Sequence, residues 1–173
     1  MPATGSMGED EHLLKRTSYW VLRKIRTVAD YQFSNSAGCT LFPDEVEVTI
    51  SRKTGKIKEI RDNGSHVATL NPKTGFLSLS IEGARRLTGK IEDSTVTVND
   101  EFVFPISRGG NVFAKHIIKA GDGLRAGNET IVVSENSSLV GVGRSLMSGG
   151  EAKGFKCGIA IKVRRGVNSQ HDA

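Results

Sequence analysis

Gly158-Ile159-Ala160-Ile161-Lys162-Val163-Arg164, close to the end of the 173-residue chain, is the stretch that decides the fold of the second half. A short, mainly apolar run between a glycine and an arginine predicts a β-strand over Ile159 to Val163. Residues 95–173 hold 12 of the 20 glycines. Four more short strands are predicted upstream, at 95–98, 111–118, 129–133 and 138–144. Closely spaced strands with glycine-rich turns predict a small barrel that closes on itself and hides its strand edges.

The front half begins with a helical pattern. Apolar residues recur at the spacing of one helical face, so a helix is expected from Leu13 to Tyr31. The apolar face consists of Val21, Leu22, Ile25, Val28 and Ala29. The run Asn35-Ser36-Ala37-Gly38 is expected to end it.

The pattern then changes to period two. Val46, Val48 and Ile50 alternate with polar residues, as in a half-buried strand. Further strands are expected around Ile57 to Ile60, at 67–70 and at 76–79, with turns between them. A short helix from 81 to 87 follows, capped by Ser80. The front half is therefore predicted to be a small α+β domain, a helix with an antiparallel sheet.

The composition shifts near residue 93, which predicts two domains. Residues 13–93 are assigned to the α+β domain and residues 94–166 to the barrel. Residues 1–12 are expected to be a disordered start and residues 167–173 a loose tail.

Composition excludes several classes of protein. No apolar run approaches the length of a membrane span, and the start lacks the pattern of a signal peptide. The two cysteines, Cys39 and Cys157, lie far apart in sequence, so neither a disulfide framework nor a paired zinc knuckle is expected. They are interpreted as small apolar fillers. A cytoplasmic protein with no membrane partner is predicted.

No group of residues carries a catalytic signature. The four histidines have no second histidine or cysteine at ligand spacing, so no metal site is expected. Lys53-Thr54-Gly55 and Lys73-Thr74-Gly75 match one element of penicillin-recognising enzymes, but their Ser-Asp-Asn partner is missing and both fit hairpin turns. The prediction is a chain that is not an enzyme, with no catalytic residue, cofactor or metal.

The charge points to a polyanionic partner. The net charge is +5, and residues 102–173 contain ten Lys or Arg against five Asp or Glu, so all of the excess lies there. A cation beside exposed backbone amides suits a phosphate group. A solvated basic face with turn glycines explains the same residues equally well. Taken from the residues alone, both interpretations stay open.

A resemblance narrows the choice. The segments that carry it are Val112-Phe113-Ala114-Lys115, residues 125–133, residues 139–146 and Phe155 to Arg164. They resemble a PUA domain, the small RNA-binding pseudo-barrel of pseudouridine synthases and archaeosine transglycosylases. The front half is similar to the domain that precedes PUA in archaeal tRNA-guanine transglycosylase. It shares Ala29-Asp30-Tyr31-Gln32-Phe33, Leu41-Phe42-Pro43, residues 51–57, Gly75 to Leu79 and residues 82–87.

The resemblance implies a role without catalysis. The large catalytic barrel of that family, with its carboxylates and zinc-binding cysteines, has no counterpart in these residues. We therefore expect a protein that binds RNA, either tRNA at its acceptor arm and 3′ end or another structured RNA. It would serve as the separate RNA-binding subunit of an archaeosine-forming transglycosylase. The alternative is a free-standing PUA adaptor in translation or ribosome assembly, which acts through protein–protein contacts and would show an apolar patch.

The resemblance also implies where RNA binds. In PUA domains RNA meets the first glycine-rich loop, the helix after it and the last strands. Glycines would admit the RNA backbone, and Arg144, Lys153 and Lys156 would contact phosphates or base edges. Barrel packing is the alternative role for Phe113 and Ala114, and strand packing for Gly141 and Gly143. The full set is Gly109, Gly110, Asn111, Phe113, Ala114, Lys115, Gly141, Gly143, Arg144, Lys153, Lys156 and Gly158.

Overall fold

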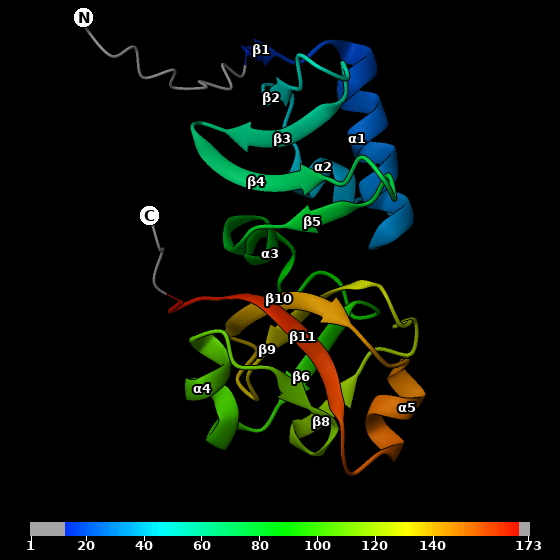
Figure 1. Ribbon diagram of the computed structural model, residues 1–173, viewed down its shortest axis with the longest axis vertical. Helices are drawn as coiled ribbons and strands as arrows, with labels where there is room; N and C mark the ends of the chain where they lie inside the picture. The colour runs from blue at the N-terminus through cyan, green and yellow to red at the C-terminus, as the bar shows by residue number, and fades with distance from the viewer. Residues whose placement is uncertain (1–12, 170–173) are drawn as a thin grey trace, which may run out of the picture.

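The computed structural model describes residues 13–169, and Figure 1 shows them as two domains, one above the other. The predicted disordered start, residues 1–12, lies outside the described residues, as do residues 170–173 of the predicted tail. Within that tail, the amides of Val167 and Asn168 donate to the carbonyls of Val140 and Ser107 at 3.0 and 2.8 Å.

The first domain consists of helices packed on one antiparallel sheet. Its sheet has the strand order β1-β2-β3-β4-β5, so β5 is an edge strand. Helix α1 lies alongside the sheet and buries Leu22, Ile25 and Ala29, three residues of the predicted apolar face. The elements are β1 (Leu13–Arg16), α1 (Tyr19–Gln32), α2 (Ala37–Leu41), β2 (Glu47–Ile50), β3 (Ile57–Asp62), β4 (Ser65–Leu70), β5 (Leu77–Leu79) and α3 (Ile81–Leu87).

The prediction that the first helix starts at Leu13 was wrong. Residues 13–16 form β1 instead, which pairs antiparallel with β2 from Leu13 opposite Ile50 to Arg16 opposite Glu47. Helix α1 begins after Ser18, whose hydroxyl accepts a hydrogen bond from the Val21 amide at 3.4 Å. This side chain serves as the N-cap, so the helical face starts six residues later than the pattern of polar and apolar residues suggested.

The second domain is a six-stranded sheet with the order β7-β11-β10-β9-β6-β8. Its pairs are antiparallel except β6 with β9, which is parallel. The elements are β6 (Thr95–Val98), η1 (Asp100–Phe102), α4 (Val103–Ser107), β7 (Val112–Phe113), η2 (Ala114–His116), β8 (Ile117–Ala120), β9 (Glu129–Val133), β10 (Leu139–Ser145), α5 (Gly149–Gly154) and β11 (Ile159–Gly166).

The sheet curls into a nearly closed pseudo-barrel because its two outer strands are consecutive in the chain. Strands β7 and β8 lie at opposite ends of the strand order, yet only the single turn η2 separates them. The strand predicted from Asn111 to Ile118 was therefore wrong as one element, because η2 breaks it. Inside η2 the ring of His116 stacks on Phe102, with centroids 3.7 Å apart. The predicted fold class, an α+β domain followed by a PUA-like pseudo-barrel, is confirmed.

A shared core joins the two domains. Ile131, Val133 and Val142 of the barrel belong to the same buried cluster as Phe42, Leu79 and Leu87 of the first domain. A second buried cluster, which includes Val98, Leu124 and Ile161, fills the barrel itself. Because apolar side chains of both domains are buried in one cluster, the domains hold a fixed relation at this contact.

Candidate nucleic-acid interface

The glycine-rich loop that sequence reasoning selected lies between α4 and β7. Gly109 has φ of +102°, which favours glycine. A Cβ on Gly110 would stand 2.8 Å from the carbonyl oxygen of Pro105. The side-chain oxygen of Asn111 accepts a hydrogen bond from the amide of Val163 at 3.1 Å. The loop thus packs closely against α4 and is hydrogen-bonded to β11.

The next residues of the predicted set adjoin that loop. Phe113 of β7 lies opposite Ile159 of β11, and the Ala114 amide donates to the Gly158 carbonyl at 3.0 Å. Ala114 is only 3% exposed, so its side chain belongs to the barrel wall. Phe113 is 40% exposed, and Lys115 is exposed beside it. The exposed members of this group are therefore the Phe113 ring, the Lys115 ammonium and Gly158.

Lys153 and Lys156 lie on α5 and just after it, and both are exposed. The helix starts with a capping box, in which Glu151 accepts hydrogen bonds from the amide and hydroxyl of Ser148, both at 2.8 Å. These hydrogen bonds lower the pKa of Glu151. The Lys153 ammonium pairs with Asp122 at 2.8 Å, and this hydrogen bond and charge lower the pKa of Asp122. The positive charge of Lys153 is therefore partly offset before any ligand binds.

Gly141 and Gly143 lie in β10, where both are buried against β11. A Cβ on Gly143 would stand 2.3 Å from the carbonyl oxygen of Lys162, and one on Gly141 would stand 2.9 Å from that of Arg165. Real side chains do not approach backbone so closely, so strand packing accounts for these two glycines.

Arg144 follows them on β10 and is exposed. It lies directly opposite Lys162 of β11, so both side chains point to the same side of the sheet, away from the barrel core. Gly158 lies just before β11 and four residues before Lys162, a separation of about 13 Å for an extended chain. The structure thus divides the predicted residues into two groups. Asn111, Phe113, Ala114 and Gly158 are joined by contacts between β7 and β11, and Arg144 lies apart from them on β10.

Arg144 lines a cleft of about 530 Å³ between the two domains. Sequence reasoning did not select this cleft, because its walls come from segments that are far apart in the chain. Two more arginines line it, Arg125 and Arg164, together with two aromatic side chains of the first domain, Tyr31 and Phe76. Tyr31 and Phe76 both lie within the segments that resemble the transglycosylase family. That resemblance was the one feature of the sequence that could have drawn attention to them.

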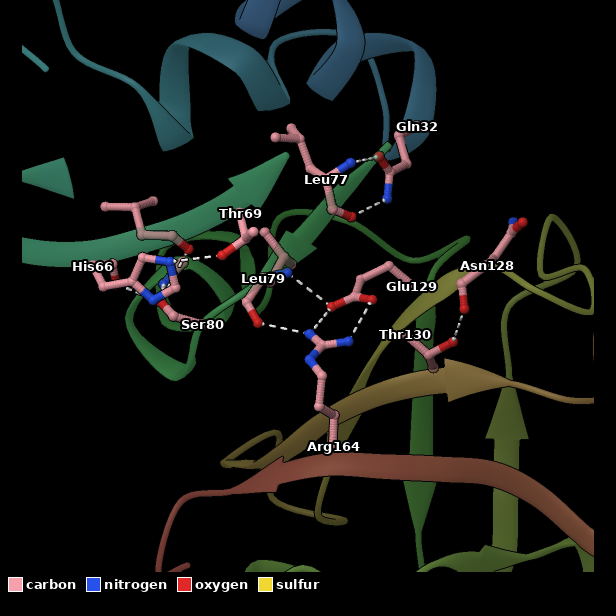
Figure 2. A network of polar contacts seen from close by, with 12 residues as sticks. Gln32, His66, Thr69, Leu77, Leu79, Ser80, Asn128, Glu129, Thr130 and Arg164 are labelled. Carbon is pink, nitrogen blue, oxygen red and sulfur yellow. Dashed lines mark hydrogen bonds and ion pairs between the residues drawn. The ribbon is translucent and has the colours of Figure 1, made fainter. Parts of the chain in front are cut away.

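Figure 2 shows a polar network, several of whose residues also line the cleft, among them Gln32, Glu129 and Arg164. Strand β5 is an edge strand, yet side chains satisfy its outward backbone groups. The side-chain amide of Gln32 donates to the Leu77 carbonyl at 2.7 Å and accepts from the Leu77 amide at 2.8 Å. Glu129 and Arg164 make the corresponding contacts to Leu79, both at 2.8 Å. The backbone groups of Leu77 and Leu79 at this edge are therefore hydrogen-bonded to side chains.

Two further predictions concern other sites. Cys39 and Cys157 are both exposed, so the interpretation as buried apolar fillers was wrong. Each stands in an irregular or short helical segment at the surface rather than in a strand that faces the core.

Within residues 13–169, no three His, Cys, Asp or Glu side chains gather as a metal site would require. No helix of the described part is both long and apolar enough to cross a membrane.

Comparison with known families divides the chain at the same place as the fold. Residues 23–93 match the patch-forming domain C2 of tRNA-guanine transglycosylase. Residues 94–167 match the PUA domain. The chain joins a C2 domain to a PUA domain. The resemblance that the motifs indicated is confirmed for both halves.

Relatives of this C2–PUA chain are much longer proteins. The tRNA-guanine(15) transglycosylase of Thermococcus kodakarensis is 40% identical over 169 residues, which cover 96% of this chain and 29% of the relative. The enzyme of the same name from Thermoplasma volcanium is 39% identical over 147 residues, 84% of this chain and 23% of the relative. The chain thus spans under a third of the length of these curated relatives.

Solved structures share the fold of most of the C2–PUA chain, across both domains. A hypothetical protein of Pyrococcus horikoshii superposes with a TM-score of 0.72 at 21% identity, over 91% of this chain and 96% of that one. A conserved PUA domain protein from Thermoplasma acidophilum gives 0.64 at 18% identity, over 91% and 96% of the two chains. Both are similar in fold alone.

Proposed function

We propose that this C2–PUA chain is a non-catalytic, cytoplasmic protein that binds tRNA at its acceptor arm and 3′ end. It would act as the RNA-binding subunit of an archaeosine-forming tRNA-guanine transglycosylase. The relatives described in the preceding subsection are named tRNA-guanine(15) transglycosylases, and the present residues match C2 and PUA domains. The enzyme partner would supply the chemistry, and this chain would supply affinity for RNA.

One observation supports the proposal most directly. Lys115 and Lys156 are both exposed and lie one and two residues from Ala114 and Gly158, whose backbones are joined by a hydrogen bond of 3.0 Å. Phe113, which is 40% exposed, lies on β7 opposite Ile159, the residue after Gly158. Cations suit phosphates, and an aromatic ring suits an unstacked base. This surface, formed by Phe113, Lys115, Lys156 and Gly158, is named the loop surface below.

Binding of bulk tRNA across a salt series tests the proposal. A chain that neutralises phosphates should lose affinity steeply as salt rises. Replacement of Lys115 and Lys156 by alanine should weaken binding and reduce the slope of log K against log salt by about 1 for each contact removed. The control is Lys24→Ala, an exposed lysine on α1 of the other domain. Absence of tRNA binding at low salt would contradict the proposal.

A second experiment concerns the subunit role. The chain should be recovered with a transglycosylase catalytic chain from the same cell, and addition of the C2–PUA chain should raise that enzyme's activity on tRNA. A chain that binds tRNA but neither associates with the enzyme nor affects its rate would leave RNA binding in place and contradict the subunit role.

A further inference from the structure

The cleft between the two domains has one aromatic wall. Tyr31 lies in the last turn of α1 and Phe76 lies just before β5. The two rings are nearly parallel, 6° apart, with centroids separated by 6.3 Å. Tyr31 is 81% exposed, so its ring is not part of the hydrophobic core. An exposed pair of parallel rings is a surface on which a nucleic-acid base can stack, whatever its identity.

The opposite wall is basic and comes from the PUA domain. The guanidinium of Arg144 reaches to within 3.3 Å of the position that a Cβ on Gly127 would occupy. Among residues 13–169, Arg144 makes no ion pair. Its whole fork of donors is therefore available to an anion. Glycine at position 127 leaves the space that this side chain occupies.

Arg125 adds a second cation whose position is fixed. One of its terminal nitrogens donates to the carbonyls of Asp122 and Leu124, at 2.7 and 3.0 Å. These bonds hold the guanidinium at the cleft without neutralising its charge. Arg164 also lines the cleft, but Glu129 pairs with it. The lining side chains thus comprise three arginines and one glutamate, a net charge of +2.

We propose that this cleft binds one unpaired nucleotide of the RNA, with its base against Tyr31 and Phe76 and its phosphate at Arg144 and Arg125. The volume of about 530 Å³ lies within the range of small-molecule pockets and suits a single nucleotide. The cleft would act together with the loop surface, as a second contact on the same RNA. The inference rests on the proposed function, because it requires that the chain binds RNA.

The probes are two hairpin RNAs with the same stem, one with a single-stranded 3′ tail and one blunt. Anisotropy of a fluorescent label gives the dissociation constant of the full chain for each. The wild-type chain should bind the tailed hairpin more tightly. The double variant Tyr31→Ala/Phe76→Ala should weaken binding of the tailed hairpin by about tenfold or more and leave that of the blunt hairpin unchanged. Arg144→Ala should act in the same direction, and Arg144→Lys should recover part of the loss.

Trp20→Ala is the matched control for the aromatic pair. Trp20 is also on α1 and is 71% exposed, but it does not line the cleft. Its replacement should leave both dissociation constants unchanged. A second readout places the contact. A tail that carries 5-iodouridine, irradiated in the complex, should crosslink to Tyr31 or Phe76, as mass spectrometry of the digested protein would show.

The outcomes separate this inference from the proposed function. If the wild-type chain binds both hairpins and the Tyr31→Ala/Phe76→Ala variant retains its full preference for the tail, the cleft assignment is overturned and RNA binding stands. If the crosslinks fall only on the loop surface, the cleft assignment is overturned in the same way. If the wild-type chain binds neither hairpin nor tRNA, both proposals fail.

Discussion

Glu129 and Arg164 form an ion pair in the PUA domain, and together they bind both backbone groups of Leu79 in the C2 domain. The Leu79 amide donates to Glu129 and its carbonyl accepts from Arg164, both at 2.8 Å. A second nitrogen of Arg164 donates to Glu129 at 2.9 Å. The pair thus takes the place of a neighbouring strand at the open edge of β5 (Figure 2).

The pair predicts unequal effects of its two single variants. The Glu129 side chain is only 6% exposed and that of Arg164 is 38% exposed. Arg164→Ala leaves a buried carboxylate without its cation and should lower the free energy of unfolding by about 3–5 kcal/mol. Glu129→Ala lets the arginine turn to water and leaves mainly the Leu79 amide unpaired, a loss of about 1–3 kcal/mol. Urea denaturation of both variants measures these values.

The double variant and a surface pair complete this test. Glu129→Ala/Arg164→Ala should cost less than the sum of its single variants, because the second change removes a group that the first left unpaired. Asp44→Asn breaks an ion pair with Arg26 in which the aspartate is exposed, and it should change stability by less than about 1 kcal/mol. Equal losses for Glu129→Ala and Arg164→Ala would show that the burial difference does not govern the pair.

Gln32 predicts a local effect at the same edge. Its side-chain amide is the hydrogen-bond partner of both backbone groups of buried Leu77. Gln32→Leu keeps the volume but leaves both groups unpaired, so stability should fall by about 1–3 kcal/mol. Hydrogen exchange of the Leu77 amide should accelerate more than that of amides in β3. Arg23→Ala, an exposed change on the same helix, is the control and should leave the exchange rate of Leu77 unchanged.

Strand periodicity predicted most of the fold, because alternation and turn residues are local signals. The strands at 95–98 and 129–133 and the helix at 81–87 have the predicted bounds. Residues 13–16 were assigned to a helix because their strand pairing depends on β2, more than 30 residues away. The turn η2 was missed because it depends on the stacking of His116 on Phe102, which no local pattern reveals.

The candidate site was harder to predict for a similar reason. Lys115 and Lys156 could be chosen from charge and resemblance, and the structure leaves both exposed, close in sequence to the hydrogen-bonded backbones of Ala114 and Gly158. Gly143 was chosen for the same reasons, but its position is explained by the approach of β11. The aromatic pair of the cleft consists of residues 31 and 76, and its basic wall begins at residue 125. Only the packing of the two domains brings these positions together.

A comparison of two glycines tests the packing role of Gly143, because one glycine is packed against backbone and the other faces open space. Gly143→Ala would place a Cβ 2.3 Å from the Lys162 carbonyl, so β10 and β11 must separate and stability should fall by about 1–3 kcal/mol. A Cβ on Gly150 of α5 meets nothing within 4 Å. Gly150→Ala should therefore be neutral or raise stability by up to about 1 kcal/mol, since alanine favours the helix. Thermal and urea unfolding of both variants would measure the contrast, and a harmless Gly143→Ala would contradict the packing role.

His116 predicts how stability depends on pH. Burial lowers its pKa below the ordinary value of 6.5, and the neighbouring charge of Lys115 lowers it further. The ring nitrogen Nδ1 also accepts a hydrogen bond from the Phe113 amide at 3.4 Å, which a protonated ring could not do. Well above pH 6.5 the ring is neutral in both the folded and the unfolded chain, so the folded state keeps its full stability. Below that value the unfolded chain binds the proton more readily, so stability falls as the pH is lowered toward the folded-state pKa.

A variant isolates this contribution. His116→Phe can keep the stack on Phe102 but cannot bind a proton. Its urea midpoint should therefore fall less than that of the wild-type chain when the pH is lowered from about 7.5 to about 5.5. These two pH values lie about one unit on each side of the ordinary histidine pKa. The pKa of His66 is lowered as well, chiefly by burial, so part of the pH dependence should persist in His116→Phe. His66→Gln should remove that remaining part when the two changes are combined. Identical pH profiles for the wild-type chain and His116→Phe would show that His116 titrates alike in the folded and unfolded chain.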